Sequence, residues 1–200
     1  MKVGIVALQG GFYEHVYMLR RLAEETGWSI EPVLVKKSND LRGLDAVIIP
    51  GGESTTIGVV ARRIGLLDEL RDLLESGLPA MGTCAGAALL AKSVRDRVVG
   101  ETRQPLLAVM NIEVVRNYYG RQRESFEVDL KIPVLGEKPF RGVFIRAPAI
   151  TRLWGRAKGI AELDGVTVVA EEDGKLALAF HPELTGDTRL HRYFVENIKR

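Results

Sequence analysis

Residues 82–86 read Gly-Thr-Cys-Ala-Gly, and Cys84 is the one cysteine of this 200-residue chain. The segment stands between an apolar run, Pro79 to Met81, and a run of helical character, Ala87 to Lys92. Glycines two positions before and after the cysteine permit the sharp strand-to-helix turn of a nucleophile elbow, which holds the side chain accessible but strained. The start of a helix favours the thiolate, the form that attacks. A buried, inert cysteine is the alternative, but that role does not require the flanking glycines.

A cysteine nucleophile needs a base and a group that orients the base. His181 and Glu183 directly follow the apolar run Leu176 to Phe180, so both are expected at a strand end, where α/β sheets carry their sites. Two residues apart in extended backbone, they point the same way, so Glu183 can hold one imidazole nitrogen while the other faces the thiol. A capping or loop histidine is the alternative. The elbow in the same chain favours a Cys84, His181, Glu183 triad.

Residues 50–55, Pro-Gly-Gly-Glu-Ser-Thr, form a third polar segment after an apolar run. A phosphate-binding loop is disfavoured, because the segment lacks the lysine and the glycine spacing of a P-loop. The N–H group of Gly52 could instead join that of Ala85 in an oxyanion hole. A plain tight turn is the alternative.

Other side chains suited to chemistry carry weaker signals. Arg116 and Arg146 follow extended apolar runs, and a guanidinium fork suits the α-carboxylate of an amino acid, although either could form a surface ion pair. His15 and His191 fall on predicted helices among charged neighbours, and we interpret both as surface residues. The chain has no metal-ligand spacing, so we expect neither a metal nor an organic cofactor.

The elements that must position these residues alternate between apolar runs and segments of helical period, which indicates an α/β fold with a mostly parallel sheet flanked by helices. Predicted strands cover Val3 to Leu8, Ile30 to Val35, Asp45 to Pro50 and Pro79 to Gly82. Predicted helices cover Glu14 to Thr26, with Val16, Leu19, Leu22 and Ala23 on one face, then a stretch after Gly52, Leu66 to Leu74, and Asp187 to Ile198 capped by Asp187. An antiparallel extension is predicted from Asn111 to Arg116, Ser125 to Ile132 and Gly142 to Arg146, and a hairpin from Val166 to Glu171 and Leu176 to Phe180.

Composition excludes several classes of function. The net charge of +2 calls for no nucleic-acid or acidic-membrane partner, and no apolar stretch has the length of a membrane span or a signal peptide. A chain of this length with 46% hydrophobic residues can form one domain over residues 1–200. A single cysteine fits a reducing compartment, so we expect a cytoplasmic protein.

Together the motifs resemble the class I glutamine amidotransferases, and within them the glutaminase subunits of pyridoxal 5'-phosphate synthases. The resemblance runs in order through residues 7–10, 51–55, 82–86, 116–117, 120–122, 125–127, 144–148 and 181–184. Ala87 and Ala88 stand where bulkier aliphatic residues are usual, and residues 94–106 match little, which leaves local helix packing and part of the docking surface in doubt.

The resemblance implies a flavodoxin-like sheet and hydrolysis of L-glutamine through a thioester on Cys84. It implies glutamine contacts from residues in the three polar segments and the later strands: Gly52, Glu53, Ser54, Arg116, Ile145 and Arg146. It also implies a partner synthase with a (β/α)8 barrel, which combines the ammonia with pentose and triose phosphates. Gln9 matches a residue of the docking face.

We expect the isolated chain to be a poor glutaminase, because the Gly51-Gly52 peptide can change orientation at little cost and leave the oxyanion hole unformed. Gln9 ends the first predicted strand near Gly52 and is a candidate relay from the partner, or simply a polar residue that caps the strand. Two other functions stay open. One is an amidotransferase that feeds a different synthase, and the other is a non-catalytic binding or chaperone-like module.

Overall fold

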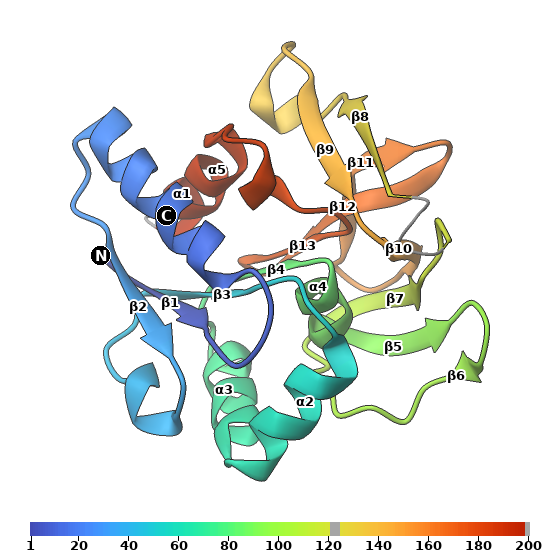
Figure 1. Ribbon diagram of the computed structural model, residues 1–200, viewed down its shortest axis with the longest axis horizontal. Helices are drawn as coiled ribbons and strands as arrows, with labels where there is room; N and C mark the ends of the chain where they lie inside the picture. Colours follow the sequence, from blue (N-terminus) through green and yellow to red (C-terminus); the bar gives the residue numbers. More distant parts are fainter. Residues whose placement is uncertain (121–124, 199–200) are drawn as a thin grey trace.

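The computed structural model describes residues 1–120 and 125–198, in which a large mixed sheet separates two layers of helices (Figure 1). Its parallel half has the strand order β2-β1-β3-β4-β13. This is the order of doubly wound flavodoxin-like sheets, so the expected fold class is confirmed. The strands are β1 (Lys2–Val6), β2 (Glu31–Val35), β3 (Ala46–Ile49), β4 (Ala80–Thr83) and β13 (Lys175–Leu178).

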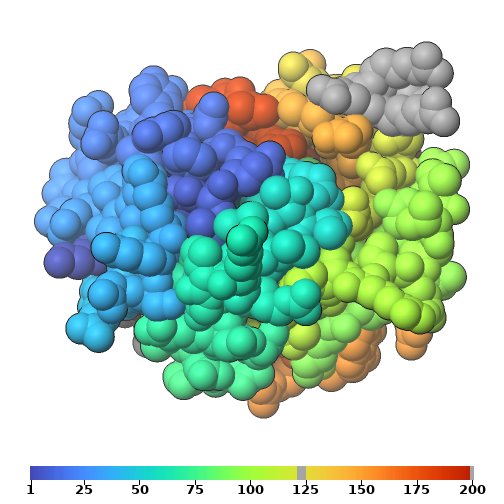
Figure 2. All heavy atoms as spheres, turned by 60° about the horizontal axis from the view of Figure 1, so that its bottom comes forward, coloured from blue at the N-terminus to red at the C-terminus, as the bar shows by residue number. Residues whose placement is uncertain are grey.

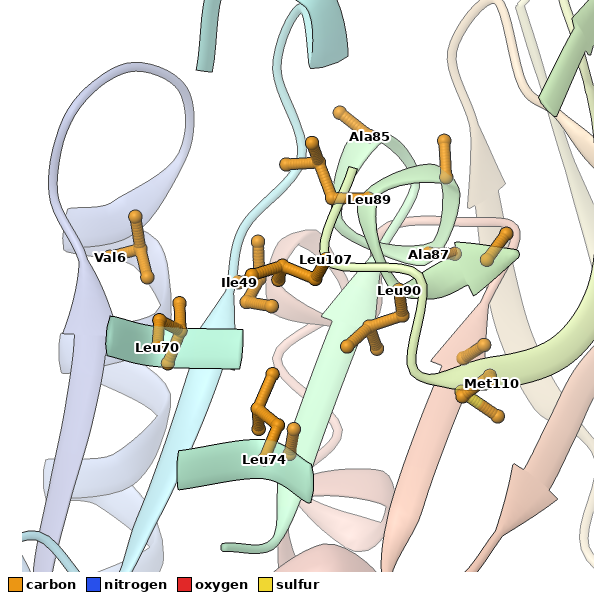
Figure 3. Close-up of a cluster of buried hydrophobic side chains, with 14 of the residues drawn as sticks. Val6, Ile49, Leu70, Leu74, Ala85, Ala87, Leu89, Leu90, Leu107 and Met110 are labelled. Carbon is orange, nitrogen blue, oxygen red and sulfur yellow. The ribbon is translucent and has the colours of Figure 1, made fainter. Parts of the chain in front are cut away.

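The two faces of the parallel strands bury alternate residues against different helices. On one face Val3 and Ile5 pack with residues of α1 (Phe12–Thr26) and α5 (Arg189–Ile198). On the other face Val6 and Ile49 pack with residues of α2 (Ser54–Arg63), α3 (Leu66–Glu75) and the short α4 (Ala85–Leu90). Figure 3 shows this second cluster, with Leu89 and Leu90 of α4 close to Ile49 and with Leu70 and Leu74 of α3 below them.

Helix α4 is fully buried, and its small residues let it lie directly on the sheet. A Cβ atom on Gly86 would be 2.0 Å from the carbonyl oxygen of Ile49, so the helix backbone touches the strand. Ala87 and Ala88 are 0% and 1% exposed. The predicted helix over Ala87 to Lys92 therefore begins and ends two residues early, and the chain enters a strand at Ala91.

The second half of the sheet is more complex than the predicted extension. It consists of β12 (Val166–Glu172), β11 (Lys158–Leu163), β10 (Ala149–Leu153), β7 (Met110–Arg116), β5 (Ala91–Asp96) and β6 (Gly100–Glu101). The predicted closing hairpin is confirmed as β12 and β13. β7 pairs antiparallel with β10 but parallel with β5, which the sequence analysis did not identify. β8 (Phe126–Leu130) and β9 (Phe140–Phe144) pair only with each other among the described strands.

The described residues also include three 3-10 turns, η1 (Ser38–Leu41), η3 (Pro133–Leu135) and η4 (Pro182–Leu184). The last helix begins at Arg189, two residues later than predicted, although Asp187 still accepts a hydrogen bond from the N–H of Arg189 at 3.1 Å. Figure 2 shows the elements up to α3 on one side of the molecule and β5 to β9 on the other. No helix in the described ranges is long and apolar enough to cross a membrane.

Candidate active site

Cys84 sits at the turn between β4 and α4, in a backbone conformation that L residues rarely adopt, with φ 49°. Its N–H donates to the carbonyl of Leu178 in β13, 2.8 Å away. Both flanking glycines are needed for close approach, since a Cβ on Gly82 would be 2.6 Å from the backbone of Gly86. The side chain is buried at 8% exposure but lines a pocket. These are the features of a strained nucleophile elbow.

His181 follows β13, and its Nδ1 lies 2.7 Å from Oε1 of Glu183. The two residues do pair, but not for the reason inferred from the sequence. Glu183 belongs to the 3-10 turn η4, so the backbone here is not extended. This turn brings the carboxylate of Glu183 to the imidazole ring. The backbone N–H of His181 donates to the carbonyl of Val143, 2.9 Å away. Cys84 is close enough to His181 to affect its protonation, and both side chains line the same pocket.

The charges of this cluster support one another. Burial alone would lower the pKa of His181, but hydrogen bonds to Cys84 and Glu183, together with their charges, raise the pKa to about 10. Burial raises the pKa of Glu183, whereas His15 and His181 more than offset this and hold the pKa below its usual range. A protonated His181 beside an ionised Glu183 is thus the favoured state at neutral pH.

Gly51 and Gly52 lie between the ring of His181 and the loop after β1, and neither has room for a side chain. A Cβ on Gly51 would lie 2.3 Å from the ring of His181, and one on Gly52 would lie 2.4 Å from Oε1 of Gln9. That Gln9 oxygen accepts a hydrogen bond from the N–H of Glu53 at 2.8 Å. β1 ends at Val6, so Gln9 lies in the loop after the strand and not at its end, and there it ties this loop to the loop after β3.

Arg116 lies in the wall of the same pocket, where its guanidinium already has partners. Nη2 pairs with Glu53 at 3.0 Å, and Nη1 bonds to Thr55 and Gln104. Glu53 in turn caps α2 by accepting from the N–H groups of Thr55 and Thr56. The structure thus gives Arg116 an ion pair, one of the two roles left open by the sequence, and adds Gln104, which lies in the poorly matching segment 94–106.

A pocket of about 240 Å³ joins these residues. Its volume is below the roughly 300–1,000 Å³ of pockets for drug-sized ligands, which suits a smaller ligand of amino-acid size. All the residues expected to contact glutamine or the oxyanion line it, together with the nucleophile and base: Gly52, Glu53, Ser54, Arg116, Ile145, Arg146, Ala85, Cys84 and His181. Gln9, Ala88, Asn117 and Pro148 also line it. In Figure 1 the chain segments after β1, β3 and β4 meet beside α4, at the carboxyl ends of these strands.

The interpretation of His15 and His191 as surface residues is wrong, since both are 0% exposed. His15 shares the buried face of α1 with Met18, Leu19 and Leu22, at the spacing of a core helix. That spacing was the available signal, and the charged neighbours obscured it.

Arg121 and Gln122, part of the matching segment 120–122, lie outside the described residues. Within residues 1–120 and 125–198, no group of three or more His, Cys, Asp or Glu side chains is arranged to hold a metal ion.

Comparison with known proteins shows the family of this chain. A family model described as the SNO glutamine amidotransferase family matches residues 5–200. A protein named pyridoxal 5'-phosphate synthase subunit PdxT from Staphylothermus marinus is 58% identical over 202 residues, covering 99% of this chain and 98% of the relative. One of the same name from Saccharolobus islandicus is 57% identical over 201 residues, with 100% of both chains covered. A solved structure described as a glutamine amidotransferase is 48% identical, with TM-score 0.88 and 99% of each chain covered.

Proposed function

Because the chain belongs to the SNO glutamine amidotransferase family, we propose that it hydrolyses L-glutamine to L-glutamate and ammonia and passes the ammonia to a pyridoxal 5'-phosphate synthase partner. The observation that carries the proposal is the hydrogen-bonded pair of His181 and Glu183, with Cys84 and His181 lining one pocket of amino-acid size. The names of the similar relatives support the identity of the synthase.

Reaction begins when the Cys84 thiolate attacks the side-chain carboxamide carbon of glutamine. The carbonyl oxygen becomes an oxyanion, which the N–H groups of Gly52 and Ala85 stabilise. The bond to nitrogen then breaks, and His181 donates its proton to the leaving ammonia, which leaves a thioester on Cys84. Glu183 orients the imidazole ring and stabilises its charged form.

The second half of the reaction regenerates the enzyme. Neutral His181 removes a proton from water, the hydroxide attacks the thioester carbon, and the sulfur leaves as thiolate with glutamate as the product. Overall one glutamine and one water give one glutamate and one ammonia. No metal or organic cofactor takes part in this scheme.

Glutamine is held by the residues that line the pocket. Glu53 and Arg146 are charged groups of opposite sign suited to the α-ammonium and α-carboxylate of the substrate. Arg116 acts by fixing Glu53, with which it pairs at 3.0 Å. Gly52, Ser54 and Ile145 complete the lining around the bound amino acid.

The partner in this proposal is a (β/α)8-barrel subunit that consumes the ammonia in a hetero-oligomeric, cytoplasmic complex. Gln9 relays docking to Gly52, so that glutamine is hydrolysed only when ammonia can be used. A non-catalytic module is disfavoured by the complete set of Cys84, His181 and Glu183, and a different synthase is disfavoured by the full-length similarity to the relatives.

Covalent labelling of the complex tests the reaction. A glutamine-mimicking electrophile such as 6-diazo-5-oxonorleucine should label one residue, Cys84, and glutamine should protect it. Cys84→Ala should release no glutamate above background. An adduct elsewhere, or glutamate released by Cys84→Ala at the wild-type rate, would remove Cys84 from the reaction.

Co-purification of the native protein identifies the partner, and recovery with a different synthase would overturn that assignment.

A further inference from the structure

A line of buried polar side chains continues behind the triad. Oε2 of Glu183 lies 3.5 Å from Nε2 of His15, and in the described part of the chain this oxygen has no hydrogen-bond partner of normal length. The same His15 nitrogen is 3.2 Å from Oγ1 of Thr83, the residue before the nucleophile. His15 Nδ1 is 3.0 Å from Nε2 of His191. The side chains of His15 and Glu183 are 0% and 1% exposed.

Both histidines are neutral near pH 7, because burial lowers the pKa of His15 and lowers that of His191 to about 3. A neutral imidazole carries one N–H group. If His15 carried it on Nδ1, a nitrogen lone pair on Nε2 would face the ionised Glu183, and the N–H of His191 would have to sit on Nδ1. That nitrogen has no partner among the described residues, so a buried donor would go unsatisfied.

In the opposite tautomers the N–H group of each buried histidine has an acceptor. His191 then donates from Nε2 to Nδ1 of His15, and His15 offers its Nε2–H to Glu183 and Thr83. His181 donates to Oε1 of Glu183, and the Nε2–H of His15 faces Oε2 at 3.5 Å.

We propose that His15 is a positioning residue for the glutaminase reaction, in which its Nε2–H group holds the second carboxylate oxygen of Glu183. This inference rests on the proposed function and adds a residue to it. His15 does not reach the substrate, so its loss should change kcat and leave KM for glutamine nearly unchanged. One charge-assisted hydrogen bond contributes roughly 1.5–3 kcal/mol, which converts to about a 10- to 100-fold change in rate.

Two substitutions separate positioning from packing. The amide nitrogen of glutamine can take the place of Nε2, whereas that of asparagine can take the place of Nδ1. His15→Gln should keep the donor to Glu183 and retain kcat within about a few-fold of wild type, while His15→Asn should lose about 10- to 100-fold in kcat. Leu22→Ala is the matched control, because Leu22 is buried on the same face of α1 and its truncation lowers the melting temperature without touching the triad.

For each variant, glutamate release is measured on the chain bound to its synthase. The melting temperature of the variant is measured as well, to separate loss of packing from loss of positioning. Equal losses in His15→Gln and His15→Asn, or a kcat for His15→Asn equal to wild type, would overturn the inference while the wild type remains active. A wild-type complex that releases no glutamate instead overturns the proposed function, and the inference with it. Should His15→Asn not fold, nitrogen-15 NMR of labelled wild-type protein decides, because His15 must carry its proton on Nε2 at neutral pH. A proton on Nδ1 refutes the arrangement.

Discussion

Gly51 lies against the ring of His181 so closely that a Cβ atom added to the glycine would be 2.3 Å from Cε1 and 2.8 Å from Nδ1 of the ring. Real Cβ atoms do not approach other atoms this closely, and the ring is held by Glu183 below it. The absence of a side chain at Gly51 therefore allows the His181 ring to occupy its observed position.

Gly51→Ala should displace His181 and lower glutamine turnover by about 100-fold, since misplacing a catalytic group by about 1 Å can cost that much. The rate of glutamate release by the complex measures the effect. Gly159→Ala in β11 is the matched control, because its added Cβ would meet only the side chain of Thr167 at 3.3 Å. A Gly51→Ala enzyme of normal rate would show that the ring can move without consequence.

Glu183→Gln should preserve glutamine binding and lower kcat by about 10²- to 10⁴-fold, because a neutral amide cannot stabilise the imidazolium or accept at both ends. Steady-state kinetics of the complex separate kcat from KM. Glu24→Gln, an exposed position on α1, controls for the loss of one negative charge. An unchanged kcat would place Glu183 outside the reaction.

Gln9→Ala should reduce the stimulation of glutaminase activity by the synthase, because it removes the acceptor that holds the N–H of Glu53 at 2.8 Å. Gln9→Glu keeps an acceptor oxygen and should retain part of the stimulation. Glutamate release is compared with and without the synthase. A lone wild-type chain as fast as the complex contradicts gating altogether, whereas a Gln9→Ala protein that behaves like wild type shows only that the relay uses other residues.

The buried histidines should make the fold sensitive to acid. Burial is the main cause that lowers the pKa of His191 to about 3. Between about 6.5 and about 3 the unfolded chain binds a proton at this residue that the folded chain does not. The free energy of unfolding should therefore fall on acidification through this window, by at most about 1.4 kcal/mol per pH unit for one ring.

Urea unfolding of wild type and His191→Gln between pH 7 and pH 4 measures this contribution. The variant should be less stable at pH 7 but show a shallower dependence on pH. His15 and Glu183, which face His191, contribute in the same direction, because the pKa of each is lowered by folding. Parallel curves for the two proteins would mean that His191 does not resist protonation.

The parallel half of the sheet could be predicted because β1, β3 and β4 are almost wholly buried and appear as continuous apolar runs. The short strands β5, β10 and β11 could not, because their residues alternate irregularly: Ala91–Asp96, for example, includes exposed Lys92 and Arg95. Their existence depends on partners distant in the sequence.

The residues of the site also include some that the local sequence predicts and some that it does not. Cys84 and His181 could be predicted from local turn chemistry and a strand end, and the pairing with Glu183 was right although the backbone between them is a 3-10 turn. The burial of His15 depends on His191, which lies 176 positions away. A contact of that kind leaves only a weak trace in either helix.

The insertion of β13 beside β4 has a consequence for protein synthesis. The thiol belongs to the first half of the chain, but β13, the strand that His181 follows, pairs with β4 only after nearly all of the chain has been made. During translation the N-terminal part folds first, so in the proposed reaction an unfinished chain would hold Cys84 without His181. A fragment that stops before Lys175 should accordingly release no glutamate, and an interrupted ribosome makes a silent product rather than one that drains the cell of glutamine.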